Sequence, residues 1–327
     1  MQDTSVPESR HLSRQGNPEA FPILSDEQVR LIAEVGQRRL FEDGDDVWKI
    51  GLPMTSFFVV VRGAVEVFQI TGTGEEPRVV MHQPGEFTGD IDLLSSSATV
   101  VGARAHGETE TIEVPAERLR RFVVENSELS DIILAAFLAR RQELLATGRG
   151  SLTIVGSRFS PDTFRIREFL ERNSRPFEWI DLESDDRVSR LLDGLGVGTE
   201  ETPIVIDSGG VVTHNPTIEQ MAECFGLSQV DERQIYDVIV VGAGPAGLAA
   251  AVYAASEGLE VLIVDAVAPG GQASTSSKIE NYLGFPTGIS GRELAQRAFV
   301  QATKFGAEVA APREVVGLDV SSRPYTL

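Results

Sequence analysis

A short apolar run followed by three spaced glycines constrains this chain more than any other feature. Residues 238–241 are all valine or isoleucine, and Gly242, Gly244 and Gly247 follow them in a G-x-G-x-x-G pattern. The pattern predicts a buried parallel strand, a tight turn, and a helix that begins at the turn. This order is typical of a Rossmann-like fold that binds a dinucleotide.

Each residue type in this turn has a mechanical reason. Gly242 lets the chain turn tightly, Gly244 lets backbone N–H groups approach a pyrophosphate, and Gly247 lets the helix pack closely on the strand. The start of the helix, at Pro245 and Ala246, adds unpaired donors and a positive dipole. These five residues are therefore predicted to bind the cofactor.

A second apolar run, residues 261–264, ends on Asp265. A carboxylate at the end of this second strand is expected to accept hydrogen bonds from the ribose hydroxyls of an adenosine half. Residues 238–255 contain no charged side chain and reach the lower length limit of a membrane span. Three glycines and Pro245 divide them into a strand and a helix, so no membrane segment is predicted.

The segment after Asp265 contains Gly270-Gly271-Gln272 and, further on, Glu280-Asn281-Tyr282. Residues 269–286 and 291–294 closely resemble the thioredoxin reductase family of FAD-dependent pyridine nucleotide-disulfide oxidoreductases. In that family these segments wrap the flavin side of the cofactor. The resemblance therefore implies that Gly271, Gln272 and Asn281 contact FAD.

The resemblance also implies an activity for the complete protein: hydride passes from NADPH to FAD, and electrons then pass to a disulfide of a thioredoxin-like or other protein substrate. In the family, a C-x-x-C and a second G-x-G-x-x-G belong to an NADPH domain inserted later in the sequence. This sequence stops at Leu327, before either. A fragment or truncated product is expected, with no catalytic residue and no turnover of NADPH by itself.

The sequence contains a single cysteine, Cys224, and thus no C-x-x-C. One cysteine permits no intramolecular disulfide, which fits a reducing cytoplasm. Cys224 lies in a short helical pattern, where a buried structural thiol is predicted.

Residues 21–148 predict a short helix, many strands and then a long helix. Short β-rich runs at residues 57–61 and 65–70 are separated by a turn expected at Gly63. Residues 132–145 are expected to form a long amphipathic helix that could also pair two chains in a homodimer.

Residues 57–67 and 84–94 resemble the cyclic nucleotide-binding domain family, which is a β-roll followed by a long helix. In that family an acid of the phosphate-binding cassette takes the ribose hydroxyl, and an arginine a few residues on pairs with the cyclic phosphate. Here Gly89-Asp90 stands in the acid's place and Ser96 stands about where the arginine should be. Without its main charge-assisted contact the cassette is degenerate. The fold is expected, and cyclic nucleotide binding is not.

Residues 151–228 follow the order β-α-β-α-β, with Thr202-Pro203 before the last strand. This order resembles the thioredoxin/glutaredoxin fold, in which that proline is usually cis. The positions of the family's redox C-P-x-C are held here by Ser160 and Thr163. Both sulfurs are replaced by hydroxyls, so thiol–disulfide exchange is excluded there. A docking or spacer module with a lost redox pair is predicted.

The predicted organisation is multidomain, α+β and α/β. A disordered tail (1–20) precedes a β-roll domain with helices (21–148), a central thioredoxin-like domain (151–228), and the N-terminal part of a Rossmann-like FAD-binding fold (234–327). Residues 148–151 are expected to be a flexible joint. The net charge of −20 opposes binding to nucleic acid or an anionic membrane. No secretory signal is seen, and the four histidines have no metal-ligand spacing, so no metal and a cytoplasmic location are predicted.

Other functions stay open at this point. The chain could be a non-enzymatic ligand-sensing or interaction protein with a vestigial FAD lobe. It could also belong to an NAD(P)H-dependent flavoprotein reductase with a different acceptor, such as a ferredoxin- or flavodoxin-type NADP reductase. The flavoprotein partner of a peroxiredoxin is a further alternative, which the N-terminal β-roll disfavours.

Overall fold

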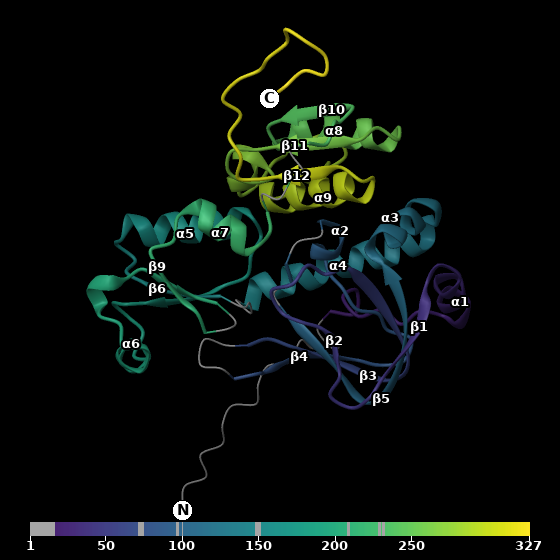
Figure 1. Cartoon of the computed structure of the whole chain (residues 1–327), viewed down its shortest axis with the longest axis horizontal. Helices are drawn as coiled ribbons and strands as arrows, with labels where there is room; N and C mark the ends of the chain where they lie inside the picture. The colour runs from purple at the N-terminus through teal and green to yellow at the C-terminus, as the bar shows by residue number, and fades with distance from the viewer. Residues whose placement is uncertain are drawn as a thin grey trace, which may run out of the picture.

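The computed structural model describes residues 17–70, 75–95, 98–99, 101–147, 152–207, 210–227, 230 and 233–327. Ser96, the expected joint at residues 148–151 and most of the expected N-terminal tail lie outside the described residues. Figure 1 shows three lobes, each built on its own β-sheet: an N-terminal lobe (17–147, purple to blue), a central lobe (152–227, teal to green) and a C-terminal lobe (233–327, green to yellow). The C-terminal lobe lies above the other two in this view.

The described residues of the N-terminal lobe form an antiparallel β-roll with the helices α1 to α4. Its strands follow the order β1-β5-β3-β4, and β2 also pairs with β5. Asn17 to Ala20 form a turn at the edge of this lobe, where Ala20 is fully buried. The elements are α1 (Asp26–Val35), β1 (Gln37–Phe41), β2 (Asp46–Trp48), β3 (Ser56–Phe68), β4 (Arg78–His82), α2 (Asp92–Ser95), β5 (Gly102–Pro115), α3 (Ala116–Glu125) and α4 (Ser127–Thr147).

The turn expected at Gly63 is wrong, because β3 runs through this glycine without a break. The strand pairs with β5 on both sides of Gly63, and its register shifts next to Arg62. Gly63 has a φ of +77°, and a Cβ there would lie 2.5 Å from the carbonyl oxygen of Glu108. Glycine is therefore needed for a β-bulge at a close approach of two strands.

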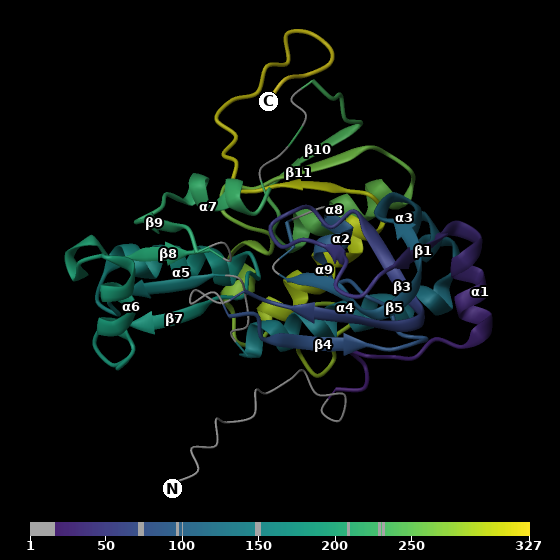
Figure 2. The same cartoon turned by 60° about the horizontal axis from the view of Figure 1, so that its bottom comes forward.

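The buried side of helix α4 carries polar and charged residues as well as apolar ones, which differs from the expected amphipathic pattern. Phe137 packs its ring against the rings of Phe57 and Phe87 in the core of the roll. Elsewhere on the helix, Ser130 accepts a hydrogen bond of 2.7 Å from Lys304 of the C-terminal lobe. The buried side includes polar residues as well as apolar ones: Leu129, Ser130, Ile133, Ala136, Phe137, Ala139, Arg140, Arg141 and Leu144. The helix therefore lies between lobes (Figure 2).

The central lobe is a four-stranded mixed sheet with helices on it. The strand order is β7-β6-β8-β9; β7 is parallel to β6, while β8 and β9 continue antiparallel. The Thr202–Pro203 peptide bond before β8 is cis. The elements are β6 (Thr153–Gly156), α5 (Pro161–Arg172), β7 (Glu178–Asp181), α6 (Val188–Leu195), a 3₁₀ turn η1 (Thr199–Glu201), β8 (Ile204–Ile206), β9 (Val212–His214) and α7 (Ile218–Cys224).

The C-terminal lobe is a three-stranded parallel sheet in the order β10-β11-β12. Because the strands are parallel, the carboxyl ends of β10 and β11 lie at the same edge. The elements are β10 (Val238–Val241), α8 (Pro245–Ser256), β11 (Val261–Val264), a 3₁₀ turn η2 (Gly271–Thr275), α9 (Gly291–Lys304) and β12 (Glu308–Ala310).

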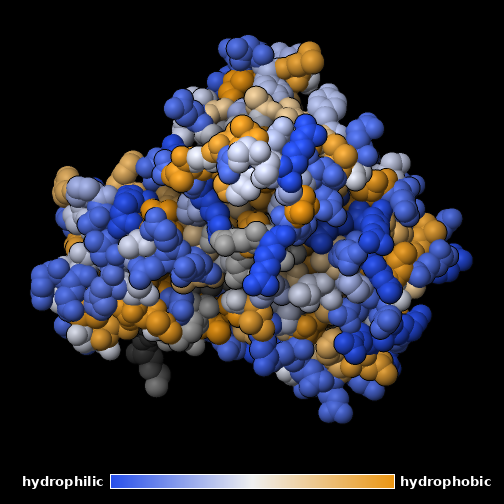
Figure 3. All heavy atoms as spheres, turned by 45° about the horizontal axis from the view of Figure 1, so that its top comes forward, coloured by the Kyte–Doolittle hydropathy of each residue, from blue (hydrophilic) through white to orange (hydrophobic). Residues whose placement is uncertain are grey.

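One apolar cluster joins both helices of the C-terminal lobe to its sheet, with Leu248 from α8, Ile263 from β11 and Ala302 from α9. Other apolar side chains of this lobe are exposed, among them Ile235, Val241, Leu283, Val316 and Leu318. Figure 3 shows hydrophobic residues on the surface of the upper part of the molecule in that view. Within the described part of the chain, every helix is too short or too polar to span a bilayer.

Candidate functional site

The three spaced glycines lie where β10 meets α8. Gly242 has a φ of +97°, a conformation that favours glycine. Gly244 is the N-cap of α8, Pro245 is its first residue, and Ala246 follows. A Cβ on Gly247 would lie 1.9 Å from the carbonyl oxygen of Gly242, so no larger residue fits there. A Cβ on Gly244 would meet no surrounding atom within 4 Å, so the space before the helix is open.

A second glycine turn packs directly against the first. The N–H of Gly270 donates to the carbonyl oxygen of Ala243 at 2.7 Å. A Cβ on Gly271 would lie 3.0 Å from the Cα of Gly244, and both Gly270 and Gly271 have positive φ angles, +104° and +55°. Two segments that are separate in the sequence therefore meet in front of α8, and glycine allows their backbones to approach.

Asp265 holds the first glycine turn through its carboxylate. Oδ2 accepts from the N–H of Ala243 at 2.7 Å, and Oδ1 accepts from the N–H groups of Val267 and Ala268 at 2.9 and 3.0 Å. An ionised carboxylate offers about four acceptor positions. About one acceptor position of the Asp265 carboxylate therefore remains for the predicted contact with the ribose hydroxyls. Asp265 also holds the backbone of the glycine turn, a role that the sequence did not indicate.

The two remaining predicted FAD contacts are exposed. Gln272 follows Gly271 in η2, beside the paired glycine turns. Asn281 lies further along the chain, on the loop between Ile279 and Ile289. These two residues form an isolated antiparallel β-bridge that closes the loop. The structure therefore places Gln272 next to the glycine site, whereas none of the contacts described above includes Asn281.

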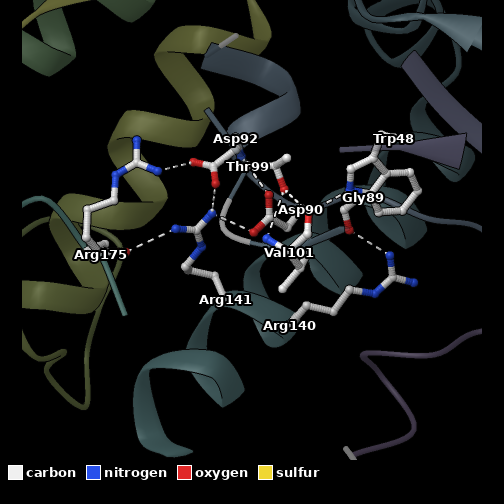
Figure 4. A network of polar contacts seen from close by, with 10 residues as sticks. Trp48, Gly89, Asp90, Asp92, Thr99, Val101, Arg140, Arg141 and Arg175 are labelled. Carbon is white, nitrogen blue, oxygen red and sulfur yellow. Dashed lines mark hydrogen bonds and ion pairs between the residues drawn. The ribbon is translucent and has the colours of Figure 1, made fainter. Parts of the chain in front are cut away.

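In the N-terminal lobe, the cassette acid is tied into a buried ion-pair network (Figure 4). Asp90 Oδ2 lies 2.5 Å from Arg141 Nη2, and the same nitrogen lies 2.6 Å from Asp92 Oδ2. The other oxygen of Asp92 accepts a hydrogen bond of 2.9 Å from Arg175 Nη1. The network connects the cassette to α4 and to the central lobe.

Burial and the neighbouring charges shift the pKa values of the residues in this network. Burial raises the pKa of Asp92, but the charges of Arg141 and Arg175 outweigh it and hold this pKa below its ordinary range. Burial, together with the neighbouring charge of Asp92, raises the pKa of Asp90 despite Arg141. Burial lowers the pKa of Arg175, although Asp92 opposes the shift. Asp92 is thus the carboxylate that pairs with two arginines, whereas Asp90 pairs with Arg141.

A second buried arginine binds the backbone of the cassette. Arg140 donates to the carbonyl oxygens of Gly89 at 2.7 Å, Phe87 at 3.0 Å and Ala20 at 2.7 Å. Burial lowers its pKa to about 10. The cassette backbone around Gly89 is thus held from behind by α4.

Sequence reasoning missed the three arginines that organise this region, Arg140, Arg141 and Arg175. Two adjacent arginines inside the otherwise apolar run of α4 were a usable signal, because charged residues on a buried face need partners. Arg175 follows α5 and carries no comparable signal. Arg104, the first arginine after the cassette in sequence, forms 2.8 Å ion pairs with Glu66 and Glu76.

The predicted lost redox positions lie together at the start of α5. Ser160 is the N-cap, and its Oγ accepts from the N–H of Thr163 at 3.3 Å. Thr163 is buried, and a Cβ on Gly156 at the end of β6 would lie 2.4 Å from its hydroxyl oxygen. The two hydroxyls therefore occupy one helix start beside the central sheet.

The burial predicted for Cys224 is wrong, because its side chain is exposed at the end of α7. Met221, Ala222 and Phe225 take the positions that face the core, and Cys224 points away from them. Partial burial, with the charges of Asp207 and Glu223, raises the pKa of the thiol. Among the described residues, no group of three or more His, Cys, Asp or Glu side chains is placed to hold a metal ion.

Two family models match separate parts of the chain. Residues 38–126 match the cyclic nucleotide-binding domain, and residues 236–327 match the pyridine nucleotide-disulphide oxidoreductase family. The first range covers the roll and the second covers the glycine turns, so the resemblances of these two parts to the cyclic nucleotide-binding domain and to the pyridine nucleotide-disulfide oxidoreductases are confirmed.

The C-terminal lobe is similar to known thioredoxin reductases. The Bacillus subtilis thioredoxin reductase is 48% identical over 81 residues, which is 25% of each chain. The Arabidopsis thaliana NADPH-dependent thioredoxin reductase 3 is 39% identical over 97 residues, which is 28% of this chain and 18% of that protein. A solved thioredoxin reductase from Gloeobacter violaceus is 38% identical over 27% of each chain, with a TM-score of 0.25. The chain spans about a quarter or less of the length of these relatives.

Proposed function

We propose that the C-terminal lobe is the FAD-binding part of a thioredoxin reductase-like flavoprotein oxidoreductase. The observation that carries the proposal is the meeting of the two glycine turns in front of α8, where a Cβ on Gly271 would lie 3.0 Å from the Cα of Gly244. Similarity to thioredoxin reductases over this same region supports it.

The residues present fit the adenosine and pyrophosphate parts of FAD. The open space at Gly244 lets a pyrophosphate approach the N–H groups of Ala246 and Gly247, which belong to the unpaired first turn of α8. The remaining acceptor position of Asp265 faces the ribose hydroxyls in this proposal. Gly271, Gln272 and Asn281 contact the flavin side, as the family resemblance implies.

FAD, when bound, supplies the hydride acceptor and the electron donor of the reaction. The part of this chain is to bind the cofactor, to orient it, and to hold its phosphates at the positive end of α8. In the complete protein, NADPH is the proposed hydride donor and a disulfide of a thioredoxin-like protein is the proposed acceptor. No catalytic residue is assigned in this chain.

The other two lobes are proposed to regulate or dock the reductase. In the N-terminal lobe, Arg141 pairs with the carboxylate of Asp90. This ion pair supports a cassette that does not bind a cyclic nucleotide, because the carboxylate is already occupied. For the central lobe, the strand order and the hydroxyls at Ser160 and Thr163 favour a thioredoxin-like fold without redox chemistry. The proposed domains are residues 21–148, 151–228 and 234–327.

A visible absorption spectrum tests the FAD proposal. The purified chain is incubated with FAD, passed through a desalting column, and scanned for flavin bands. Flavin that stays with the protein supports the proposal, and NADPH is expected to leave it oxidised. A protein that emerges colourless, while its circular dichroism shows it folded, would contradict it.

A further inference from the structure

Helix α9 of the C-terminal lobe packs against two lobes at once. It contacts α8 and the turn η2 of its own lobe, and it also contacts α2, α3 and α4 of the N-terminal lobe. In Figure 1, α9 lies on the side of the C-terminal lobe that faces the N-terminal lobe. The helix therefore connects the proposed FAD site to the β-roll.

The second half of α9 takes part in the core of the N-terminal lobe. Val300 is 3% exposed and belongs to the same apolar cluster as Phe122 of α3, and Phe299 packs against this cluster. Near the end of the helix, Lys304 Nζ donates a hydrogen bond of 2.7 Å to Ser130 Oγ of α4, and Ser130 is fully buried. The two lobes are thus joined by shared apolar burial and by a charge-assisted hydrogen bond.

The first half of α9 packs tightly against η2. The N–H of Gly291 donates to the carbonyl oxygen of Ser276, directly after η2, at 2.9 Å. A Cβ on Gly291 would lie 1.8 Å from the carbonyl oxygen of Ala273. A Cβ on Gly270, directly before η2, would lie 2.6 Å from the Cβ of Ala295. Because packing this close leaves no free space, a displacement of α9 is transmitted to η2.

The turn η2 contains Gly271 and Gln272, which are both proposed to contact the flavin side of FAD. We propose that the N-terminal lobe positions this turn through α9, and that the docking of α9 on the β-roll thereby sets the affinity of the chain for FAD. This inference rests on the proposed FAD-binding function. Val300 and Lys304 are then positioning residues, because they contact the N-terminal lobe and have no assigned contact with the cofactor.

The direction of the effect follows from the populations of two states of α9. When α9 is docked on the β-roll, η2 is held in the conformation that binds FAD, and when α9 is undocked, η2 is free to move. The apparent affinity for FAD falls with the fraction of chains in the docked state. Coupling between two sites typically changes an affinity by about 5- to 150-fold, and the coupling is reciprocal. Bound FAD therefore also stabilises the contact between α9 and the N-terminal lobe.

Val300→Ala in the full chain tests the proposal, because it shortens a side chain that faces the N-terminal lobe and leaves the glycine turns intact. Hydrogen exchange of residues 270–276 is measured by mass spectrometry without FAD, and quenching of flavin fluorescence gives the Kd for FAD. We expect faster exchange of this segment and an FAD affinity lowered by about fivefold or more. Ser130→Ala removes the acceptor of the Lys304 hydrogen bond from the other lobe, and should act in the same direction with a smaller loss of stability.

Val79→Ala is the matched control, because Val79 is also 3% exposed but lies on β4, in a different apolar cluster of the roll. It should lower the melting temperature and leave both the exchange of residues 270–276 and the FAD affinity unchanged. Exchange or FAD affinity that stays at the wild-type value in Val300→Ala, or that Val79→Ala alters equally, would overturn the proposal. Because exchange is measured without FAD, it decides whether α9 positions η2 even in a chain that does not bind FAD, an outcome that contradicts the proposed function alone.

Discussion

Asp92 Oδ1 and Arg175 Nη1 lie 2.9 Å apart, in a buried ion pair that joins the N-terminal lobe to the central lobe. The two side chains are 4 and 3% exposed. Arg141 contacts Asp92 from the other side and also binds Asp90. Asp90, which is predicted to stand in the place of the family's ribose-binding acid, is thus bound by the protein's own arginine, and this segment forms part of an interface between lobes.

Replacement of Asp92 should destabilise this interface. Asp92→Asn leaves Arg175 buried without its anion, and we expect a loss of about 3 kcal/mol in the free energy of unfolding. Urea unfolding followed by tryptophan fluorescence measures it, because the only two tryptophans, Trp48 and Trp179, lie in the two lobes that the pair joins. Glu117→Gln, which breaks an exposed ion pair with Arg121, is the control and should change the free energy by less than about 1 kcal/mol. Equal effects of the two variants would contradict the role of Asp92.

The stabilisation by Asp92 should depend on pH in a defined direction. The arginines hold its folded pKa below the unfolded value, which is about 3.9. Its contribution is therefore complete above about pH 4 and is lost as pH falls through the folded pKa. We expect the difference in unfolding free energy between wild type and Asp92→Asn to be largest above about pH 4 and to shrink at lower pH. A difference that grew on acidification would show that the pKa shift has the opposite sign.

Two glycines of the same motif should respond differently to substitution. A Cβ on Gly244 meets only open space, so Gly244→Val should fold normally and lose FAD, because the side chain blocks the pyrophosphate. A Cβ on Gly247 would lie 1.9 Å from the carbonyl oxygen of Gly242, so Gly247→Ala should lower the melting temperature as well. Flavin absorbance after desalting and thermal circular dichroism separate the two effects. Normal flavin content in Gly244→Val would show that the motif is not the site.

The local elements of the C-terminal lobe can be predicted from sequence because each depends on near neighbours. The strand, the glycine turn and the helix from residue 238 to 256 follow from residue type and spacing. In the central lobe, the cis bond before Pro203 is expected from the resemblance to the thioredoxin/glutaredoxin fold. Gly63 shows the limit of this reasoning. A glycine with positive φ serves a bulge as well as a turn, and only the pairing partner β5 decides between them.

The long-range polar contacts cannot be predicted in this way. Arg141 meets Asp90 across 51 residues, and Arg175 meets Asp92 across 83. Their pairing depends on how two lobes pack, and no local pattern encodes that. The exposure of Cys224 has the same origin on a smaller scale, since α7 is too short for its apolar spacing to identify the buried face.

Cyclic nucleotides should not stabilise the chain. The carboxylate of Asp90 is bound by Arg141, and Ser96 stands where the family's phosphate-binding arginine is expected. A ligand that bound the folded state with useful affinity would raise the melting temperature by mass action. We expect no shift with cAMP or cGMP in differential scanning fluorimetry, at concentrations where FAD does produce one. A clear shift with either cyclic nucleotide would show that the cassette still binds its ligand.

Restoring cysteines at the start of α5 should create an oxidisable pair. Ser160 is the N-cap of the helix and Thr163 lies one turn further, with 3.3 Å between the Oγ of Ser160 and the backbone nitrogen of Thr163. A thiol at a helix N-terminus has a lowered pKa, because the dipole stabilises the thiolate. The double variant Ser160→Cys/Thr163→Cys, made in a Cys224→Ser background, is therefore expected to lose both free thiols under mild oxidant.

Thiol titration and intact mass measure this, and the single variant Ser160→Cys in the same background is the control. The control should keep its thiol or form only intermolecular dimers, which size-exclusion chromatography detects. Formation of the intramolecular bond would support the thioredoxin-like assignment of the central lobe, because it requires both side chains to face each other at the helix start. Two thiols that stay reduced, in a protein that is folded and monomeric, would contradict that assignment.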